Sequence, residues 1–294
     1  LGHCFFYDAG YYLSNPIEIV KVWEGGLASH GAGVGLLLAS FLYYKKFKVK
    51  SFLWLIDRIG LVVAIGGCLI RFGNLMNSEI IGKATNSSVG FVFSHNAKVD
   101  LKNYFTGYIE DVNFSSGNGD TIVKKQKYQH VQMDLTLVKN FPKENIHSLV
   151  NKNLKEFLNV KLRKDNQHIL LFGSPKISLS QNEDGNTVAS ISAHGLPRHP
   201  AQLYESISCL FIFILLIAVY RKYDGNTPDG LLFGLFATLV FSLRFLYEFI
   251  KENQVAMEDS MVLNMGQKLS IPLIIFGIYL IVKALLQKQK KSES

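Results

Sequence analysis

The sequence predicts an α-helical polytopic membrane protein that carries an α+β extracytoplasmic insert. Nearly half of the residues, 48%, are apolar, and they gather in long runs instead of spreading evenly. Short segments rich in lysine or arginine follow several of these runs, as is typical of membrane helices. One long polar block, residues 84–196, interrupts them. We therefore expect membrane helices in residues 1–83 and 197–294, and an insert domain between them.

The predicted membrane spans are apolar segments of about 20 residues, which is the length that crosses a bilayer. They cover residues 27–44, 52–76, 203–220, 230–250 and 265–286. Residues 1–13 are apolar but too short to span. Because the sequence opens without Met, we interpret them as the end of a further span that is cut at its start. Asp57 and Arg58, near the beginning of one span, are expected to form a local ion pair.

The basic segments predict the orientation in the membrane. Residues 45–50, Arg221 with Lys222, and the lysines after residue 286 should be cytoplasmic by the positive-inside tendency. Because successive spans cross the membrane in alternating directions, all of these basic segments lie on the same side. We therefore expect a cytoplasmic C-terminus and an extracytoplasmic insert.

The insert alternates between turn signals and strand-like segments. Strands are expected within residues 104–114, 121–138, 168–172 and 187–192, and an amphipathic helix within 144–158. Turn signals at 117–120 and 182–186 separate these elements. The insert's histidines have no metal-ligand spacing and are interpreted as surface residues: His95, His130, His147, His168 and His194. We expect neither a metal site nor a disulfide framework in this chain.

A polar cluster closes the span at 52–76. Residues 71–82 read RFGNLMNSEIIG. Arg71 alone has an ordinary explanation, because an arginine at an interface extends its charge into water. The neighbouring Asn74, Asn77 and Glu79 are harder to explain, since polar groups near hydrocarbon are normally paired or functional. This segment is therefore the first candidate site.

A second candidate lies in the span at 230–250. Arg244 and Glu248 are four residues apart and share one helical face, so a structural ion pair explains their spacing without any function. An arginine in so apolar a segment is nevertheless a site hypothesis. Arg71 and Arg244 would repel each other if they met, unless an anion lay between them. A lipid phosphate suits this position, because guanidinium groups make forked contacts with phosphate.

Several stretches carry a specific resemblance. In residues 23–31, 71–82, 198–205, 244–248 and 265–267 the chain resembles the bacterial prolipoprotein diacylglyceryl transferases, an inner-membrane enzyme family. The resemblance covers the membrane portion and leaves the insert unexplained. It implies a fold of seven transmembrane helices, the first of which is missing here. It also implies transfer of the diacylglyceryl group of phosphatidylglycerol to the lipobox cysteine thiol of a prolipoprotein, the first step of lipoprotein maturation, with release of glycerol 1-phosphate and without a cofactor.

The resemblance also implies roles for individual residues. Arg71 would bind the lipid phosphate, Arg244 would assist at the head group, and His30 would be the essential histidine. The other positions implied in substrate binding are Asn74, Asn77, Glu79, Gly82, His199, Tyr204, Glu205 and Glu248. Two residues depart from the family pattern. Ala32 stands where a second glycine is common, and Lys251 stands where an arginine is often found.

The expected chemistry needs a base and a cationic site. A thiol has a pKa of about 8.5, so at neutral pH only a small fraction is thiolate and a base aids its attack. His30 either accepts the thiol proton or orients another group, and both roles stay open. Arginines would stabilise the negative charge of the phosphate as it leaves.

The sequence gives less support to two other function classes. A membrane transporter would also bury an Arg, Glu and His cluster, but transporters show internal repeats, and we find none in this sequence. A receptor whose insert binds the ligand would leave the cluster unexplained. The net charge of +8 does not require nucleic acid, because the lysines lie mainly at span ends and in the insert. The expected partners are phosphatidylglycerol, prolipoprotein signal peptides with a lipobox cysteine, and the bilayer.

Overall fold

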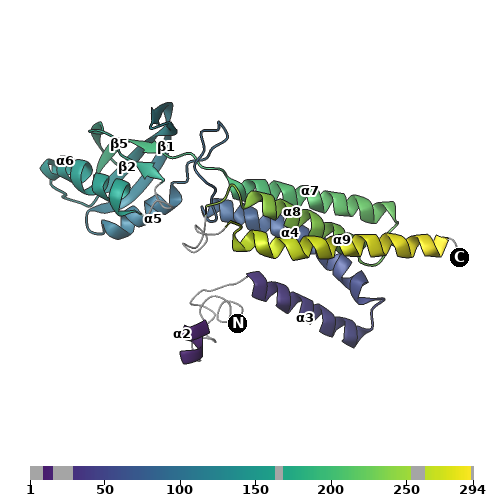
Figure 1. Cartoon of the computed structure of the whole chain (residues 1–294). Helices are drawn as coiled ribbons and strands as arrows, with labels where there is room; N and C mark the ends of the chain where they lie inside the picture. The colour runs from purple at the N-terminus through teal and green to yellow at the C-terminus, as the bar shows by residue number, and fades with distance from the viewer. Residues whose placement is uncertain (1–8, 16–28, 163–167, 253–261, 293–294) are drawn as a thin grey trace. The chain divides into compact units, whose positions relative to one another are not determined.

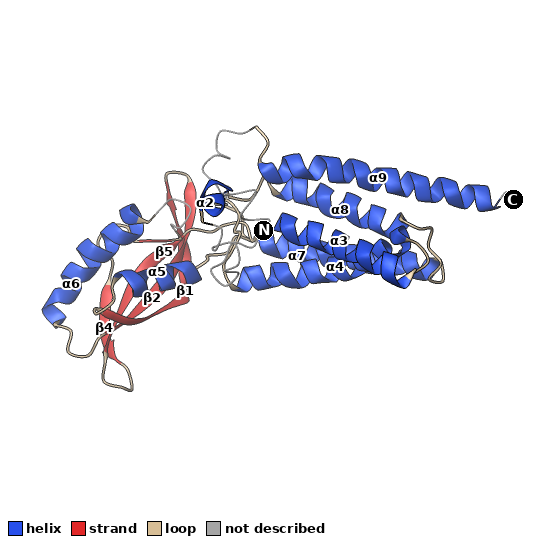
Figure 2. Ribbon diagram, turned by 90° about the horizontal axis from the view of Figure 1, so that it is seen from below, coloured by secondary structure: helices blue, strands red, loops and turns tan. Residues whose placement is uncertain are grey.

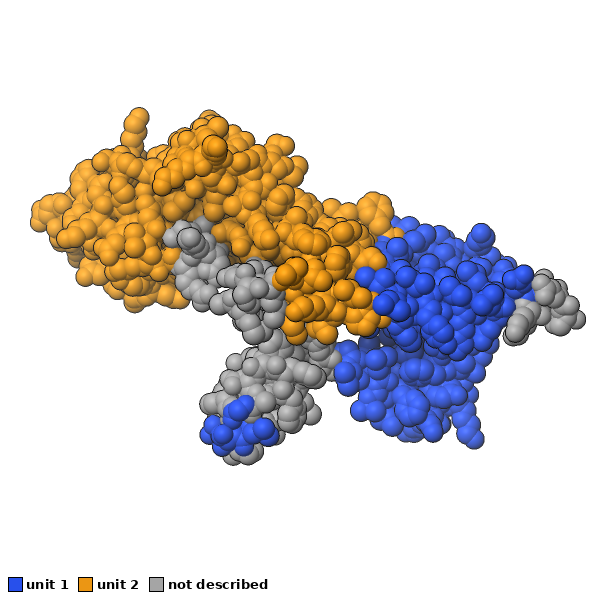
Figure 3. Space-filling view, viewed as in Figure 1, with its two compact units in different colours: residues 1–64, 212–239, 273–294 blue, residues 65–211, 240–272 orange. Residues whose placement is uncertain are grey.

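The computed structural model describes residues 9–15, 29–162, 168–252 and 262–292 (Figure 1). The chain divides into two compact units, which Figure 3 colours separately. The first unit comprises residues 1–64, 212–239 and 273–294, and the second comprises 65–211 and 240–272. Four long helices contribute residues to both units.

The five predicted spans are helices whose ends lie within a few residues of the prediction, apart from a longer C-terminal helix. These helices are α3 (Ser29–Phe47), α4 (Phe52–Met76), α7 (Ala201–Lys222), α8 (Leu231–Tyr247) and α9 (Met265–Ser292). The remnant predicted at 1–13 overlaps α2 (Ala9–Ser14), and its residues 1–8 lie outside the described residues. Among the described residues, Phe52–Met76, Ala201–Lys222 and Met265–Gln289 are long and apolar enough to cross a membrane, and α8 is apolar but shorter. Large apolar side chains on these helices are exposed, such as Phe211 at 68% and Ile275 at 63%. Exposed apolar surface of this extent suits contact with lipid, and the chain is a polytopic membrane protein.

In the first unit, Asp57 caps the beginning of α8. Its carboxylate is fully buried and accepts the backbone N–H groups of Gly230 at 2.9 Å and Phe233 at 2.8 Å. These N–H groups belong to the first turn of a helix, which has no acceptors of its own. Among the described residues, the expected close ion pair between Asp57 and Arg58 is not formed, although the charge of Arg58 acts on the carboxylate, and each side chain has other hydrogen-bond partners.

Arg58 turns toward aromatic rings and backbone carbonyls. Its guanidinium lies 4.2 Å from the ring centre of Trp54 and 5.6 Å from that of Tyr220. It donates to the carbonyl oxygens of Trp54 at 3.2 Å and Gly225 at 3.0 Å. Stacking on aromatic faces and donation to carbonyls satisfy this cation without a carboxylate.

The helices α8 and α9 approach closely at two glycines within the first unit. A Cβ atom at Gly277 would lie 2.5 Å from the Thr238 hydroxyl oxygen and 2.9 Å from the Gly234 carbonyl oxygen. Only glycine permits this approach, as is common where membrane helices pack on small residues.

The insert is an antiparallel sheet with helical segments on one face (Figure 2). Its strands are β1 (Ile109–Val123), β2 (Gln126–Leu137), β3 (Ile169–Leu170), β4 (Ile177–Gln181) and β5 (Thr187–Gly195). The order is β1-β2-β5-β3, with β4 also paired to β5. The helical parts are α5 (His95–Tyr104), α6 (Ile146–Ser148) with a 3₁₀ turn before it (Lys143–Asn145), and two π-helical segments after it (Leu149–Leu154 and Phe157–Lys161).

The core of the insert lies between the sheet and these helical segments. Alternate residues of β2 and β5, including Met133, Leu135 and Ile191, are fully buried on one face. Leu101 of α5 and Leu154 of the π-helical segment pack into the same cluster. A core of this size gives the insert its own hydrophobic interior.

Several details of the insert differ from the sequence prediction, and β4 was not predicted at all. Residues 117–120 are not a turn between strands but lie inside β1, where the register shifts between Ser116 and Asp120 and Gly119 has φ +93°. The hairpin turn is formed instead by Lys124 and Lys125, both with positive φ. The start of the predicted strand at 104–114 is the end of α5, a helix too short to give a clear periodic signal.

The histidines of the insert are not all surface residues as predicted. His95 and His147 are exposed, but His168 is fully buried. His130 and His194 are partly buried with ring centres 4.7 Å apart. Burial and the neighbouring His130 lower the pKa of His194. Sequence spacing does not reveal this pairing, because it depends on the register of β2 against β5.

We predict that Asp57→Ala destabilises the protein. The substitution leaves the N–H groups of Gly230 and Phe233 without their acceptor in a buried place, which costs about 2 kcal/mol. The unfolding temperature in detergent should fall, while Asp184→Ala, an exposed carboxylate in the loop before β5, should leave it unchanged. Equal unfolding temperatures for the two variants would contradict the capping role.

Candidate functional site

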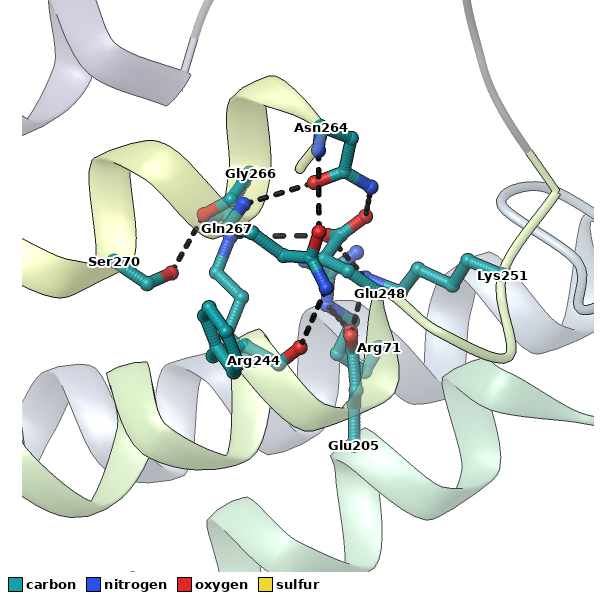
Figure 4. A network of polar contacts seen from close by, with 10 residues as sticks. Arg71, Glu205, Arg244, Glu248, Lys251, Asn264, Gly266, Gln267 and Ser270 are labelled. Atoms are coloured by element: carbon teal, nitrogen blue, oxygen red, sulfur yellow. Dashed lines mark hydrogen bonds and ion pairs between the residues drawn. The ribbon is translucent and has the colours of Figure 1, made fainter. Parts of the chain in front are cut away.

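Five charged side chains form a row of alternating sign in the second unit (Figure 4). Arg71 Nε lies 2.6 Å from Glu205 Oε2, and the Lys251 ammonium contacts the other oxygen of the same carboxylate. That ammonium also lies 3.2 Å from Glu248 Oε1, and Arg244 Nε lies 4.0 Å from this oxygen. The order is therefore Arg71, Glu205, Lys251, Glu248 and Arg244. We call these residues the charge row.

The charge row joins helix ends that are far apart in sequence. Arg71 lies near the end of α4, Glu205 near the beginning of α7, and Arg244 in the last turn of α8. Glu248 and Lys251 follow α8 directly. The anions between the two arginines are thus the protein's own carboxylates. The repulsion that we expected between Arg71 and Arg244 is relieved without a phosphate.

Burial differs along the charge row. The side chain of Lys251 is 5% exposed and that of Glu205 is 8% exposed, whereas Arg71 is 24% and Arg244 is 32% exposed. A buried charge needs close partners, which the centre of the row has. The arginines at its two ends are the cations most accessible to a ligand.

The beginning of α9 supports the charge row through a capping box. The Asn264 carboxamide oxygen accepts the backbone N–H of Gln267 at 2.9 Å, and the Gln267 carboxamide oxygen accepts the backbone N–H of Asn264 at 3.1 Å. The Asn264 amide also donates to Glu248 Oε2 at 2.9 Å. One asparagine therefore starts the helix and fixes the Glu248 carboxylate.

The polar residues at the end of α4 and just after it form a strained turn that holds Glu79. The Glu79 carboxylate accepts the amides of Asn74 at 2.6 Å and Asn77 at 3.5 Å. Ser78 and Ile80 both have φ of 54°, in the left-handed region that non-glycine residues avoid. This conformation costs roughly 1–2 kcal/mol for each residue and persists only where neighbours enforce it.

Two amide side chains from other elements hold the carbonyl groups of this turn. Gln202 of α7, which is 1% exposed, donates to the Glu79 carbonyl oxygen. Asn96 of α5 donates to the Ser78 carbonyl oxygen at 3.3 Å. The turn is thus fixed from a membrane helix and from the insert.

Gly82 lies where backbone segments meet. Its N–H donates to the His199 carbonyl oxygen at 3.0 Å, and it forms a β-bridge with Lys251. A Cβ atom here would lie 2.5 Å from the His199 carbonyl oxygen and 2.9 Å from that of Ile250. Glycine is therefore required for this approach, which brings Lys251 to the end of α4.

Arg198 forms a second ion pair in the same region. Its side chain is 2% exposed, and its Nη1 lies 2.7 Å from Glu252 Oε1. Its backbone pairs with Ala84 and with Phe91, at the two ends of the segment that leads into the insert. Arg198 thus links residues 84–91 to Glu252, the residue after Lys251.

His199 and Tyr204 lie beside the charge row without joining it. His199 Nδ1 lies 3.4 Å from the Tyr204 hydroxyl. The Tyr204 ring lies 6.4 Å from the ring of Tyr247, whose hydroxyl lies 2.6 Å from the Ser208 hydroxyl. These side chains place hydroxyl and imidazole groups along the beginning of α7.

A polar hollow of about 350 Å³ adjoins the strained turn. Residues of the turn and of α5 line it. The lining residues are Asn77, Glu79, His95, Asn96, Val99 and Asp100. Burial raises the pKa of the Asp100 carboxyl. With two carboxylates in its walls, the hollow is unsuited to an anion.

Comparison with known proteins decides the family. The family model described as prolipoprotein diacylglyceryl transferase matches residues 1–283. The chain belongs to the prolipoprotein diacylglyceryl transferase family. It is 34% identical over its full length to the phosphatidylglycerol–prolipoprotein diacylglyceryl transferase of Chloroherpeton thalassium, covering 74% of that protein. It is 32% identical to the proteins of the same name from Tolumonas auensis and Bacteroides fragilis, with 99% and 95% of the chain and 74% and 70% of those proteins covered.

Family membership settles the choice between the function classes. The chain is a transferase, and the transporter alternative is not supported. The matches extend over nearly the whole chain, so they include the insert, which the sequence resemblance left out.

The structure brings together most of the residues predicted for the site. Arg71, Glu205, Arg244 and Glu248 lie in the charge row. Asn74, in the last turn of α4, and Asn77 hold Glu79 in the turn after this helix, and Gly82 follows the turn. The side chain of His30, in the first turn of α3, lies outside the described residues. Its position relative to the charge row therefore stays a prediction.

Sequence reasoning missed several supporting residues. Lys251 was noted only as a departure from the family pattern, yet it is the centre of the charge row. Asn264 had a usable signal, because Asn followed three residues later by Gln before an apolar run is a capping box. Gln202 and Asn96 had none, since each acts on a backbone carbonyl distant in sequence.

We predict that Lys251→Met destabilises the enzyme strongly. Removing the ammonium leaves the carboxylates of Glu205 and Glu248 without their shared partner, and breaking a buried ion pair costs about 3–5 kcal/mol. Thermal unfolding in detergent measures the loss. Lys222→Met, at the exposed end of α7, is the matched control and should have no effect. Equal stability of Lys251→Met and the wild type would show that Lys251 is not essential to the charge row.

Proposed function

We propose that this chain transfers the diacylglyceryl group of phosphatidylglycerol to the lipobox cysteine of prolipoproteins and that the charge row binds the lipid phosphate. The observation that carries this proposal is the charge balance of the row. Three cations and two carboxylates leave one net positive charge, which matches the single negative charge of a phosphodiester. The more exposed cations are Arg71 and Arg244, whose guanidinium groups suit forked contacts with phosphate oxygens.

The reaction requires a thiolate and a stabilised leaving group. The cysteine sulfur attacks the diacylglyceryl carbon that bears the phosphate oxygen, and a carbon–sulfur bond forms as the carbon–oxygen bond breaks. Glycerol 1-phosphate leaves with the bonding electrons. Arg71 and Arg244 stabilise its increased negative charge. His30 accepts the thiol proton and later returns it to solvent or product.

Several finer features belong to the same proposal. The enzyme lies in the bacterial inner membrane with a cytoplasmic C-terminus and an extracytoplasmic insert at 84–196, as the basic segments favour. It shares the seven-helix architecture of its family. Its protein substrates are signal peptides with a lipobox cysteine, and nucleic acid is not a partner. Glu79, His199 and Tyr204 contact substrate beside the charge row.

Reconstitution tests the proposed function. The full chain in phosphatidylglycerol vesicles should add a diacylglyceryl group to a lipobox peptide, detected by mass. A peptide with serine in place of the cysteine and vesicles of phosphatidylethanolamine should both give no product. Absence of product from the cysteine peptide in phosphatidylglycerol would overturn the proposal.

We expect Arg71→Lys to lose most of the turnover although it keeps the positive charge. A lysine has a single ammonium, which cannot both contact Glu205 and present a fork to phosphate. The loss of one hydrogen bond to a charged group predicts about a tenfold to hundredfold decrease in kcat/KM. Arg221→Lys, at the exposed end of α7, is the control. Turnover close to that of the wild type in a folded Arg71→Lys protein would refute the proposed phosphate-binding role of Arg71.

His30→Gln tests the proposed base. An amide can replace a hydrogen bond but cannot accept the thiol proton, so the variant should keep phosphatidylglycerol binding and lose transfer. Wild-type turnover should fall as the pH drops through the range of an imidazole, about 6.5, because the protonated ring is no base. The measurement is turnover against pH, with lipid binding in parallel and His147→Gln as the control. Substantial turnover of His30→Gln would make His30 an orienting residue.

A further inference from the structure

Among the described residues, one side-chain hydrogen bond joins the insert to the strained turn. Asn96, near the beginning of α5, donates from its side-chain amide to the Ser78 carbonyl oxygen at 3.3 Å. The next carbonyl of the turn, that of Glu79, accepts the amide of Gln202. Two successive peptide groups are therefore held by side chains from two different elements.

The turn needs such support because of its backbone conformation. Ser78 and Ile80 have left-handed φ angles, and Ile80 is β-branched, which makes the conformation especially unfavourable. Hydrogen bonds that the turn makes within its own segment, such as Glu79 N–H to the Asn74 carbonyl oxygen at 2.9 Å, are local to residues 73–79. The contacts from Asn96 and Gln202 come from outside this segment and fix its direction.

The direction of the turn decides where the Glu79 carboxylate lies. Glu79 is flanked by the two left-handed residues, and it lines the hollow together with residues of α5. A rotation of the Ser78 peptide group would move Glu79 relative to Asn74 and Asn77, its amide partners. Any substrate group that enters the hollow would meet both the turn and α5.

We propose that Asn96 is a positioning residue for the transfer reaction, which holds the Ser78–Ile80 turn and thereby places Glu79 for substrate. The inference rests on the proposed function, because it takes Glu79 to contact substrate. It gives the insert a part in the reaction. Asn96 acts through the Ser78 carbonyl and does not itself need to touch the reacting atoms.

Asn96→Ala tests the proposal, with Asn103→Ala as the matched control. Asn103 lies on the same helix and is exposed. We expect Asn96→Ala to lower kcat/KM roughly three- to tenfold, as the loss of one neutral hydrogen bond would. Asn103→Ala should stay at the wild-type value, and both variants should unfold at the wild-type temperature. Equal kcat/KM for Asn96→Ala and Asn103→Ala would overturn the proposal.

A second test, in the Ser78→Gly variant, distinguishes a loss of positioning from a general loss of structure. Glycine adopts the left-handed conformation without a Cβ clash, so Ser78→Gly removes part of the strain that Asn96 opposes. In this background, Asn96→Ala should lower kcat/KM less than twofold. A loss as large as in the original background would overturn the positioning role.

Amide hydrogen exchange tests the same inference without a measurement of activity. Asn96→Ala should speed exchange at Ser78 and Glu79, and Asn103→Ala should not. If the wild type shows no transfer, the proposed function fails, and exchange still decides whether Asn96 holds the turn. If the wild type is active and neither exchange nor turnover changes in Asn96→Ala, only the inference fails.

Discussion

The buried charge row is the interaction on which the arrangement of the second unit depends. Lys251 and Glu205 are almost inaccessible to solvent, and a charge so placed is tolerated only when a partner of opposite sign contacts it. The partners come from the ends of α4, α7 and α8, and α9 adds Asn264. The ends of these four helices must therefore lie together, or several buried charges lose their partners at once.

One charge of the row also agrees with the helix that carries it. Arg244 lies in the last turn of α8, where the backbone carbonyls give a partial negative charge that favours a cation. Arg71 and Glu205 lie outside the last turn of α4 and the first turn of α7. Their placement therefore depends on the neighbouring side chains of the row.

The helices were predictable from sequence because an apolar run of membrane length has few other structures open to it. The span at 52–76 coincides with α4, and the polar residues that end it proved to form one turn. Contacts that depend on tertiary structure were not predictable. Asp57 was assigned to its sequence neighbour Arg58, whereas its real partners lie in the first turn of α8, 173 residues away. Residues 117–120, which include two glycines and an asparagine, were predicted to form a turn. The register of β1 against β2 shows that they form a bulge within β1.

The candidate site was predictable in its charged residues and not in its geometry. Arg71 and Arg244 stood out because arginine is rare in apolar segments. That two carboxylates lie between them follows only from the meeting of α4, α7 and α8. Gly82 shows the same limit, because a glycine in this segment indicates close backbone approach but does not indicate that the approaching group is the His199 carbonyl.

In the proposed function, the carboxylates of the charge row affect what the site binds best. Glu205 and Glu248 hold the cations in place before any lipid arrives, so little reorganisation is needed when charge develops. They also weaken the attraction for a phosphodiester, since they neutralise most of the positive charge. As the carbon–oxygen bond breaks, the departing phosphate gains negative charge and its attraction to the remaining positive charge grows. Interactions that are stronger in the transition state than in the bound substrate raise the rate of the chemical step. A partly neutralised set of arginines is therefore better suited to catalysis than an unpaired set, which would bind the lipid tightly from the start.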